Sequence, residues 1–488
     1  MPSVEIGLTA SGNPVSLLLR YANRHGLVTG ATGSGKTVTL QRLTEQFSEA
    51  GIPVFAADVK GDLSGIAARG NPDGPAAQRA KAMGRAWSAN QFPVQFWDIF
   101  GHHGIPIRTS VQEMGAQLLS RMLGLNPTQE GAMAICFRKA EDEQAWMLTL
   151  DDLRWALNDM LENREDVCRK YGNITASSIS AIQRNLLALE AQGGDKLFGE
   201  PPFDIMDFMQ TDNGRGVVNL LHADQLMEAP MLYATFLLWL LTELFRRLPE
   251  AGDLDKPKLV FFFDEAHLLF KDAPKPLLEQ IERLVRLVRS KGIGVFFVTQ
   301  SPTDIPDSVL EQLGNRIQHA LRAYTAKSMR KIRAAADALR PNPEVNAREE
   351  ITALGIGEAL VSVMEADNVP GMVQKVRIIP PAGQIGPVSY LERKTLIESS
   401  PLYPKYAAPL SLHDAAYSFT SRMREKRGLP VLPKSDEPWQ EGDYLKYVPY
   451  HVGVAPVRKG KVLFWELLRI GFWCVVLYIV VKVMLAAL

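Results

Sequence analysis

The chain has 488 residues, of which 46% are hydrophobic and 22% charged, a balance typical of a folded protein with one large core or two smaller ones. Its 54 basic side chains equal its 54 acidic ones, which excludes nucleic-acid binding through overall positive charge and leaves only a local basic patch. Three cysteines without CxxC spacing argue against a disulfide framework or a zinc site, and no leader-like segment opens the sequence, so we expect a cytoplasmic protein.

The first 25 residues predict a strand hairpin. Val4–Leu8 and Val15–Leu19 have strand-like patterns, and the turn sequence Gly12-Asn13-Pro14 lies between them. We expect this hairpin beside the site described next.

Residues 30–37 read Gly-Ala-Thr-Gly-Ser-Gly-Lys-Thr, the G-x-x-x-x-G-K-T pattern of a phosphate-binding loop. Its glycines let backbone N–H groups turn toward phosphate oxygens, while Lys36 can reach the β- and γ-phosphates and Thr37 can ligate Mg²⁺. A short apolar strand, 26–29, precedes the loop, and a helix from Val38 to Ala50 is predicted to point its positive end at the phosphates. A chance match in a glycine-rich turn is the weaker interpretation. We expect ATP to be held by Gly30, Ala31, Thr32, Gly33, Ser34, Gly35, Lys36, Thr37 and Val38.

The next predicted strand, Val54–Ala57, ends in the charged segment Asp58-Val59-Lys60-Gly61-Asp62. Sheets of α/β proteins bind ligands at the carboxyl ends of their strands. We therefore favour a functional role for this segment over a solvated loop.

A third strand is predicted at Pro93–Asp98, and from about residue 110 to residue 192 the pattern is helical. Apolar residues recur at intervals of three and four in Arg154–Glu162 and Ser177–Glu190. The stretch has the size of a helical insertion or lid and contains no catalytic cluster. We interpret His102-His103 as a pair in a loop rather than as a metal site.

The sheet is predicted to resume at Gly216–Leu220, and Met231–Phe245 predicts a buried helix because its apolar run is too short to cross a bilayer. Leu259–Phe263 is an uninterrupted apolar run, typical of a central parallel strand, and it ends in Asp264 and Glu265. After such a strand, the first acid can hold Mg²⁺ through water and the second can accept a proton from the attacking water. Two surface acids without a role are the alternative.

Leu277–Lys291 predicts an amphipathic helix, and Gly294–Gln300 predicts another buried strand with a polar end. The amide of Gln300 can hydrogen-bond the γ-phosphate or orient the attacking water. The alternative is a polar residue that merely ends a strand.

Phosphoryl transfer also needs positive charge beyond Lys36 and Mg²⁺. Arg316 and Arg322 are the candidates for an arginine finger supplied by a neighbouring subunit. We favour Arg316, which implies a ring of subunits, and a salt bridge is the alternative role for either arginine.

A late hairpin is predicted from Ala359–Met364 and Met372–Ile379, followed by a segment rich in proline and charge that we interpret as an extended connection. Residues 462–488 are long and apolar enough to span a bilayer, and basic residues precede them. We expect this tail to attach the protein to the inner membrane. A buried docking helix or an oligomer contact is the alternative, since Lys482 must snorkel if the segment spans.

Five segments in this order resemble the HerA/FtsK superfamily of ring ATPases, most closely its bacterial HerA-like helicase branch: GATGSGKT, DVKGDLSG, LVFFFDEAHLLF, FFVTQSPTDIP and LGNRIQHALRAYT. The resemblance implies a RecA-like α/β core with a mostly parallel sheet, usually hexameric, that hydrolyses ATP to move DNA through the ring. It also implies that Lys36 and Thr37 bind nucleotide and Mg²⁺, that Asp264 and Glu265 are the second acidic motif, that Gln300 is the sensor and that Arg316 is the finger.

Two features depart from that family's pattern, namely the missing β-barrel and the hydrophobic tail at 462–488. HerA itself carries a β-barrel before its phosphate loop, and the segment ahead of Gly30 is too short to encode it. The letters D-E-A-H at 264–267 also occur in two-lobed RNA helicases, but no second lobe with an arginine-rich motif follows here.

These predictions divide the chain into six segments. Residues 1–25 form the hairpin, 26–108 and 215–385 the two parts of the ATPase core, 109–214 the helical insertion, 386–461 the extended connection and 462–488 the hydrophobic helix.

Three functions remain open at this point. The first is a DNA translocase with double-stranded DNA as its partner, and the second is a membrane-associated motor that acts on a protein partner, as secretion-coupling ATPases do. The third is a regulatory switch with slow turnover.

Overall fold

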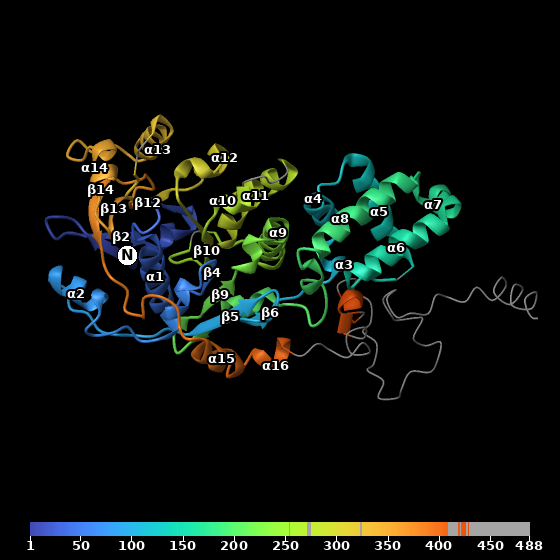
Figure 1. Ribbon diagram of the computed structural model, residues 1–488, viewed down its shortest axis with the longest axis horizontal. Coiled ribbons are helices and arrows are strands. Elements are labelled where there is room, and N and C mark those ends of the chain that lie inside the picture. The colour runs from blue at the N-terminus through green and yellow to red at the C-terminus, as the bar shows by residue number, and fades with distance from the viewer. Residues whose placement is uncertain are drawn as a thin grey trace, which may run out of the picture.

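The computed structural model describes residues 1–143, 145–252, 254–270, 275–322 and 325–407, and beyond these 418–419, 421–425 and 428. Figure 1 shows helices packed against both faces of a twisted sheet, with a further group of helices at one end of it. The sequence-based expectation of an α/β fold with a large, mostly parallel sheet is confirmed.

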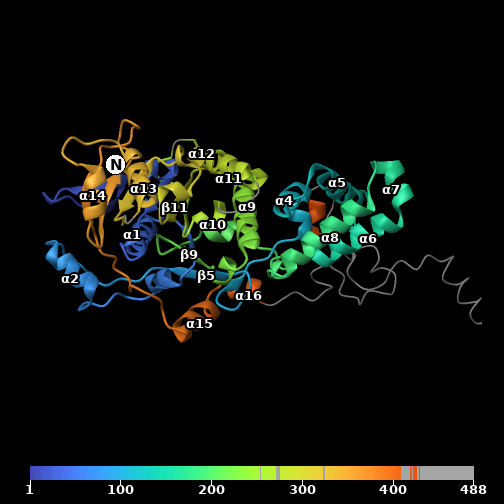
Figure 2. The ribbon, with the colours of Figure 1, turned by 45° about the horizontal axis from the view of Figure 1, so that its top comes forward.

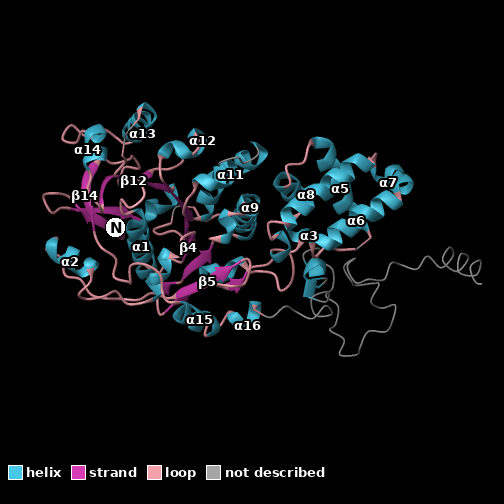
Figure 3. Ribbon diagram, viewed as in Figure 1, coloured by secondary structure: helices cyan, strands magenta, loops and turns pink. Residues whose placement is uncertain are grey.

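Within the described residues, twelve strands form one sheet in the order β2-β1-β14-β13-β12-β3-β11-β10-β4-β9-β5-β6 (Figure 3). The eight strands from β12 to β6 run parallel to one another, and the four flanking strands are antiparallel to their neighbours. The strands are β1 (Ser3–Leu8), β2 (Pro14–Leu18), β3 (Gly26–Thr29), β4 (Val54–Asp58), β5 (Val94–Asp98), β6 (Ile105–Pro106), β9 (Val218–His222), β10 (Leu259–Phe263), β11 (Ile293–Thr299), β12 (Asn315–His319), β13 (Glu358–Ser362) and β14 (Gln374–Ile378), and β7 (Thr211–Asp212) pairs separately with β8 (Arg215–Gly216).

The central strands β4, β10 and β11 are buried along their whole length. Their side chains alternate between the two faces of the sheet. Phe262 packs in the core with α1 (Lys36–Glu49), whereas Phe261 and Phe263 pack in the core with α9 (Pro230–Arg247) and α11 (Lys275–Val288). Burying an apolar side chain of this size contributes about 1.5–3 kcal/mol to the free energy of unfolding. Continuous apolar runs therefore identify these strands, because both of their faces are covered.

The register of the parallel strands brings four chain segments to one edge of the sheet. Thr29 pairs with Thr299 in the β3–β11 ladder, and Phe263 pairs with Ala57 in the β10–β4 ladder. The loops that follow β3, β11, β10 and β4 consequently lie side by side at the carboxyl ends of their strands, where α/β sheets bind ligands.

Helices between β6 and β9 gather beyond one end of the sheet, beside α9 (Figure 2). They are α3 (Val111–Met114), α4 (Ala116–Met122), α5 (Pro127–Asp142), α6 (Leu150–Glu162), α7 (Arg164–Tyr171) and α8 (Ala176–Glu190). The two helices predicted from apolar spacing are confirmed as α6 and α8. Helix α6 begins earlier than predicted because Thr149 and Asp152 form a capping box at its start.

Helix α9 is buried in the core, as predicted, with Leu237, Leu240 and Leu244 each at most 2% exposed. The described part of the chain contains no helix that is long and apolar enough to cross a membrane. The remaining helices are α2 (Pro75–Ala82), α10 (His267–Phe270), α12 (Asp307–Leu310), α13 (Ala326–Asp337) and α14 (Ala347–Ala353).

The prediction of an extended connection from residue 386 is wrong for its first part. Residues Tyr390–Glu398 form α15 and Tyr403–Tyr406 form α16. Ser389 and Glu392 make a capping box that starts α15, a local signal that proline and charge content hide. The hydrophobic segment 462–488 and most of 408–461 lie outside the described residues.

Candidate active site

The phosphate loop, residues 30–37, connects β3 to α1 at the carboxyl edge of the sheet. Its glycines have backbone φ angles that other residues rarely adopt: 156° at Gly30, 76° at Gly33 and 109° at Gly35. A Cβ atom on Gly30 would also lie 2.5 Å from the Cβ of His319. The shape of the loop therefore depends on glycine at these positions.

Helix α1 begins at Lys36, and its N-cap residue, Gly35, offers no side-chain hydrogen bond to the helix. The first turn, which includes Thr37 and Val38, thus keeps N–H groups and a positive helix end for an anion. A helix N-terminus after a glycine-rich turn is the arrangement that binds phosphate in this class of loop.

The ammonium group of Lys36 lies between the phosphate loop and the acidic pair. Its Nζ donates hydrogen bonds to the carbonyl oxygens of Gly30 at 2.6 Å and Ala31 at 3.1 Å. Burial lowers the pKa of Lys36, and the nearby carboxylates of Glu265 and Asp264 oppose this shift. The lysine is thereby held against the phosphate loop.

Contacts from distant parts of the chain brace the phosphate loop. The N–H of Ala31 donates to the carbonyl of Ala320 at 2.8 Å, and the N–H of Gly357 donates to the carbonyl of Ser34 at 3.1 Å. Arg79 of α2 in turn donates to the carbonyl of Gly357 at 2.7 Å. The motif did not predict these contacts, because they join residues far apart in the sequence.

Asp264 and Glu265 follow β10, which is separated from β3 only by β11. Burial raises the pKa of Asp264 to about 6, and the carboxylate of Glu265 adds to this effect. Asp58 ends the neighbouring strand β4, and burial, together with Asp264, raises its pKa to about 7. The structure thus brings the charged segment after β4 beside the acidic pair.

These acids fit a divalent cation. Asp58 and Asp264 are buried carboxylates at the ends of neighbouring strands, and Thr37 provides a hydroxyl oxygen at the start of α1. No group of three or more His, Cys, Asp or Glu side chains in the described ranges is arranged to hold a metal by itself. Mg²⁺ bound here would therefore take nucleotide phosphates among its oxygen ligands, as Mg²⁺ usually does.

Gln300 follows β11, the strand between the phosphate-loop strand and the strand of the acidic pair. Its neighbours are fixed by Asp304, whose Oδ2 accepts from the hydroxyl of Thr299 at 3.0 Å and from the N–H of Ser301 at 2.9 Å. Gln300 itself is exposed. Gln300 is therefore an exposed amide on a fixed turn between the phosphate loop and the acidic pair.

The two candidate finger arginines lie at opposite ends of β12. The guanidinium of Arg316, near the amino end, donates to the carbonyls of Leu313 at 3.2 Å, Ala338 at 2.6 Å and Leu310 at 3.0 Å. Arg322 follows the carboxyl end, is exposed and donates to the carbonyl of Thr352 at 2.7 Å. A finger needs guanidinium nitrogens that can reach another subunit, so this geometry favours Arg322 over Arg316.

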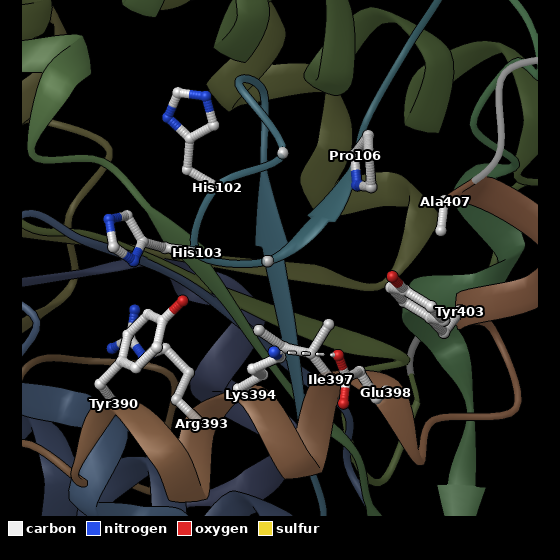
Figure 4. Close-up of a pocket in the computed structure, with 12 residues that line it drawn as sticks. His102, His103, Pro106, Tyr390, Arg393, Lys394, Ile397, Glu398, Tyr403 and Ala407 are labelled. Atoms are coloured by element: carbon white, nitrogen blue, oxygen red, sulfur yellow. Dashed lines mark ion pairs between the residues drawn. The ribbon is translucent and has the colours of Figure 1, made fainter.

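A separate pocket of about 200 Å³ lies near β5 and β6, between the His102–Pro106 loop and helices α15 and α16. In Figure 4 the side chain of Tyr390 rises from α15 toward His103, and Lys394 and Glu398, also on α15, point toward one another. His102 and His103 belong to the loop, as predicted. The centroid of the His103 ring lies 4.5 Å from the centroid of the His222 ring. This pocket contains neither the phosphate loop nor the acidic pair.

Comparison with known proteins gives one family and several similar folds. The family model described as "Helicase HerA-like C-terminal" matches residues 4–437. No curated protein matches the chain. The plasmid coupling protein TrwB in complex with the non-hydrolysable GTP analogue GDPNP has a TM-score of 0.52 at 14% identity, over 78% of this chain and 91% of TrwB.

Two further solved structures are similar. TrwB in complex with ADP and Mg²⁺ has a TM-score of 0.50 at 14% identity, over 79% of this chain and 90% of TrwB. VirB4 of Thermoanaerobacter pseudethanolicus has a TM-score of 0.49 at 15% identity, over 80% of this chain and 98% of VirB4. At such identities, the likeness to TrwB shows that the two chains share a fold.

Proposed function

This chain belongs to the HerA-like helicase C-terminal family and is a P-loop ATPase, and from that premise we propose that it is a ring motor that moves double-stranded DNA. The observation that carries the proposal is the order β3-β11-β10. This order sets the phosphate loop, Gln300 and the acidic pair at the ends of three adjacent strands, so that one bound ATP can touch all three.

In this proposal each residue has a distinct task. Lys36 and the N–H groups of the loop bind the phosphates. Thr37 and Asp264 would hold Mg²⁺, whose charge would polarise the transferred phosphoryl group. Glu265 accepts a proton from the attacking water. Gln300 orients that water or senses the γ-phosphate.

We propose that the subunits form a homo-oligomeric ring, a hexamer by the family resemblance, because a finger must come from a neighbouring subunit. Within the described residues, Lys36 and Lys60 are the cations that act on both Asp264 and Glu265, and we propose that Arg322 of a neighbouring subunit supplies further positive charge. Arg316, the candidate favoured by the sequence, is the alternative. Both assignments imply an active site at the boundary between two subunits.

Helix α13 supports DNA as the substrate. Lys327, Arg330 and Arg333 are exposed on it, while Ile332 and Ala335 are buried against the core. The Nζ of Lys331 lies 3.6 Å from Oδ1 of Asp304, the residue that fixes the turn around Gln300. DNA phosphates bound on α13 would therefore be linked to the turn of Gln300 through Lys331 and Asp304.

A membrane-associated motor that acts on a protein is the second candidate. Two observations favour it: residues 462–488 are apolar enough to attach to a membrane, and the fold is shared with the conjugative coupling protein TrwB. In this case the ATPase core lies in the cytoplasm and the tail lies in the inner membrane. The phosphate loop and acidic pair keep the same tasks.

The deciding measurement is ATP turnover by the full chain with and without double-stranded DNA. Glu265→Gln serves as the blank, because it keeps the nucleotide and loses the base. We expect stimulation by DNA that weakens steeply as salt rises, since phosphate contacts release counterions. Robust turnover that ignores DNA would favour the protein-directed motor. Tight nucleotide binding without turnover above the blank would leave a regulatory switch.

A further inference from the structure

Glu265 is held in a backbone conformation that few residues other than glycine adopt. Its φ is +46°, which lies in the left-handed region that residues with a Cβ rarely adopt. Three hydrogen bonds fix the segment: Glu265 N–H to Asp264 Oδ1 at 2.9 Å, Ala266 N–H to the carbonyl of Val298 at 2.9 Å, and Leu268 N–H to the carbonyl of Glu265 at 2.9 Å. Strain maintained in this way is typical of catalytic positions.

The side chain of Glu265 is held by a second segment of the chain. Nζ of Lys60, two residues beyond the end of β4, donates to Oε1 of Glu265 at 2.8 Å. The glutamate side chain is 7% exposed and the lysine side chain is 49% exposed. One carboxylate oxygen is therefore fixed from the solvent side by a charged hydrogen bond, which is stronger than a neutral one.

The other oxygen of Glu265 has no such partner. Oε2 is buried and has no hydrogen-bond donor among the described residues. Nδ1 of His267 is 3.4 Å away without a hydrogen bond, and it too is buried without a partner. Buried carboxylate oxygens are rarely left without a donor, so Oε2 has the surroundings of an atom that accepts a hydrogen bond from a bound molecule.

From this geometry we propose that Lys60 is a positioning residue, which holds Oε1 of Glu265 so that Oε2 faces the attacking water. The inference rests on the proposed role of Glu265 as the base. It gives the charged segment after β4 a definite task. Lys60 touches neither water nor phosphate in this role and acts only through Glu265.

Lys60 is suited to a test because its substitution leaves the core unchanged. Its side chain is half exposed, whereas its neighbour Val59 is 6% exposed and packs in the core. Lys60→Met removes the charged donor and keeps most of the aliphatic chain. Lys60→Arg keeps a cationic donor. Lys196→Met is the matched control, because it removes an exposed lysine that pairs with Asp195 away from the site.

The test measures kcat, KM and ATP affinity of the full chain. For Lys60→Met we expect kcat to fall about 10–100-fold, because a misplaced catalytic group costs rate rather than binding, with KM and ATP affinity unchanged. Lys60→Arg should restore a large part of the loss, and Lys196→Met should match the parent. An unchanged or increased kcat in Lys60→Met overturns the inference, as does a parallel loss of ATP affinity, which would make Lys60 a phosphate ligand.

A double variant separates this inference from the proposed function. If Lys60 acts through Glu265, then Lys60→Met added to Glu265→Gln should not lower the residual turnover further. A further drop of tenfold or more would show that Lys60 acts on the reaction independently and would overturn the inference. Full activity in Glu265→Gln alone would instead overturn the assignment of the base.

Discussion

The imidazole Nε2 of His319 lies 2.9 Å from the hydroxyl of Thr39, which ties the end of β12 to the first turns of α1 directly behind the phosphate loop. The other ring nitrogen, Nδ1, lies 2.9 Å from the carbonyl of Glu358. A carbonyl can only accept, so Nδ1 carries the proton and Nε2 accepts from Thr39. His319 thus joins three elements around Gly30, and it does so as a neutral ring.

Replacing His319 with alanine should loosen the phosphate loop. The change leaves a cavity and removes the partner of the buried Thr39 hydroxyl and of the part-buried Glu358 carbonyl. We therefore expect a loss of about 2–4 kcal/mol in the free energy of unfolding. ATP affinity should fall together with stability, because the ring bonds the hydroxyl of Thr39 in the first turn of α1, the helix that follows the phosphate loop. Thermal unfolding and titration with a fluorescent ATP analogue measure the two effects. His102→Ala, in an exposed loop, is the control, and equal stability of the two variants would contradict this account.

Buried neutral histidines should make the protein less stable in mild acid. His25 donates from Nε2 to the carbonyl of Val285 at 2.8 Å and accepts from the N–H of Val295 at 3.0 Å, and burial lowers its pKa to about 4. Because the unfolded chain binds the proton at about 6.5, this contribution is complete above pH 6.5 and is lost as the pH falls toward 4.

The expected slope for His25 is about 1.4 kcal/mol for each pH unit below 6.5. Unfolding curves of the parent and of His25→Gln between pH 7.5 and 5 isolate this contribution, since all other groups are shared. The parent should lose more stability than the variant over this range. Parallel pH profiles would mean that His25 is not held neutral by the fold.

The arginine finger can be assigned by mixing inactive subunits. Arg322→Ala should abolish turnover, since removing a finger costs about 10³-fold or more, and mixing it with Glu265→Gln should recover part of the activity at mixed boundaries. Arg316→Ala should instead lower stability, because three carbonyls lose their donor. Recovery with Arg316→Ala rather than Arg322→Ala would return the finger to the residue that the sequence favours.

Helix α13 should contribute charge to DNA binding and nothing to sequence preference. For Arg330→Ala combined with Arg333→Ala, we expect the slope of log affinity against log salt to decrease by about 2, since each phosphate contact contributes about 0.9. Basal turnover without DNA should be unchanged. Arg348→Ala is the control, because Arg348 is exposed but paired with Asp337 at 2.7 Å. Unaltered salt dependence in the double variant would place the DNA elsewhere.

The sequence predicts the parts of this site that are contiguous along the chain. The phosphate loop needs glycines and a lysine at fixed spacing, and the acidic pair needs an apolar strand before it, so both carry their own context. The order of strands in the sheet cannot be predicted from such local patterns. Strand β11 begins more than 250 residues after β3, yet it pairs with both β3 and β10 and so places the phosphate loop and the acidic pair two strands apart.

A contact between two single side chains that are far apart in the sequence leaves no recognisable pattern in that sequence. Lys60 and Glu265 are 205 positions apart, and Thr39 and His319 are 280 apart. The charged segment after β4 could be marked as functional from its place at a strand end, but its partner could not be named. The finger could not be assigned either, because the hydrogen bonds of Arg316 depend on where Ala338 folds back onto β12.

The amino-terminal hairpin has a consequence for how this protein can be handled. Strand β1 covers β14, and β2 forms the outer edge of the sheet beside it. Without residues 1–18, the backbone N–H and C=O groups of β14 would face solvent as an open template for another copy. A fragment that starts just before the phosphate loop would keep every proposed site residue and yet expose this edge, so it should be more prone to aggregate than the full chain.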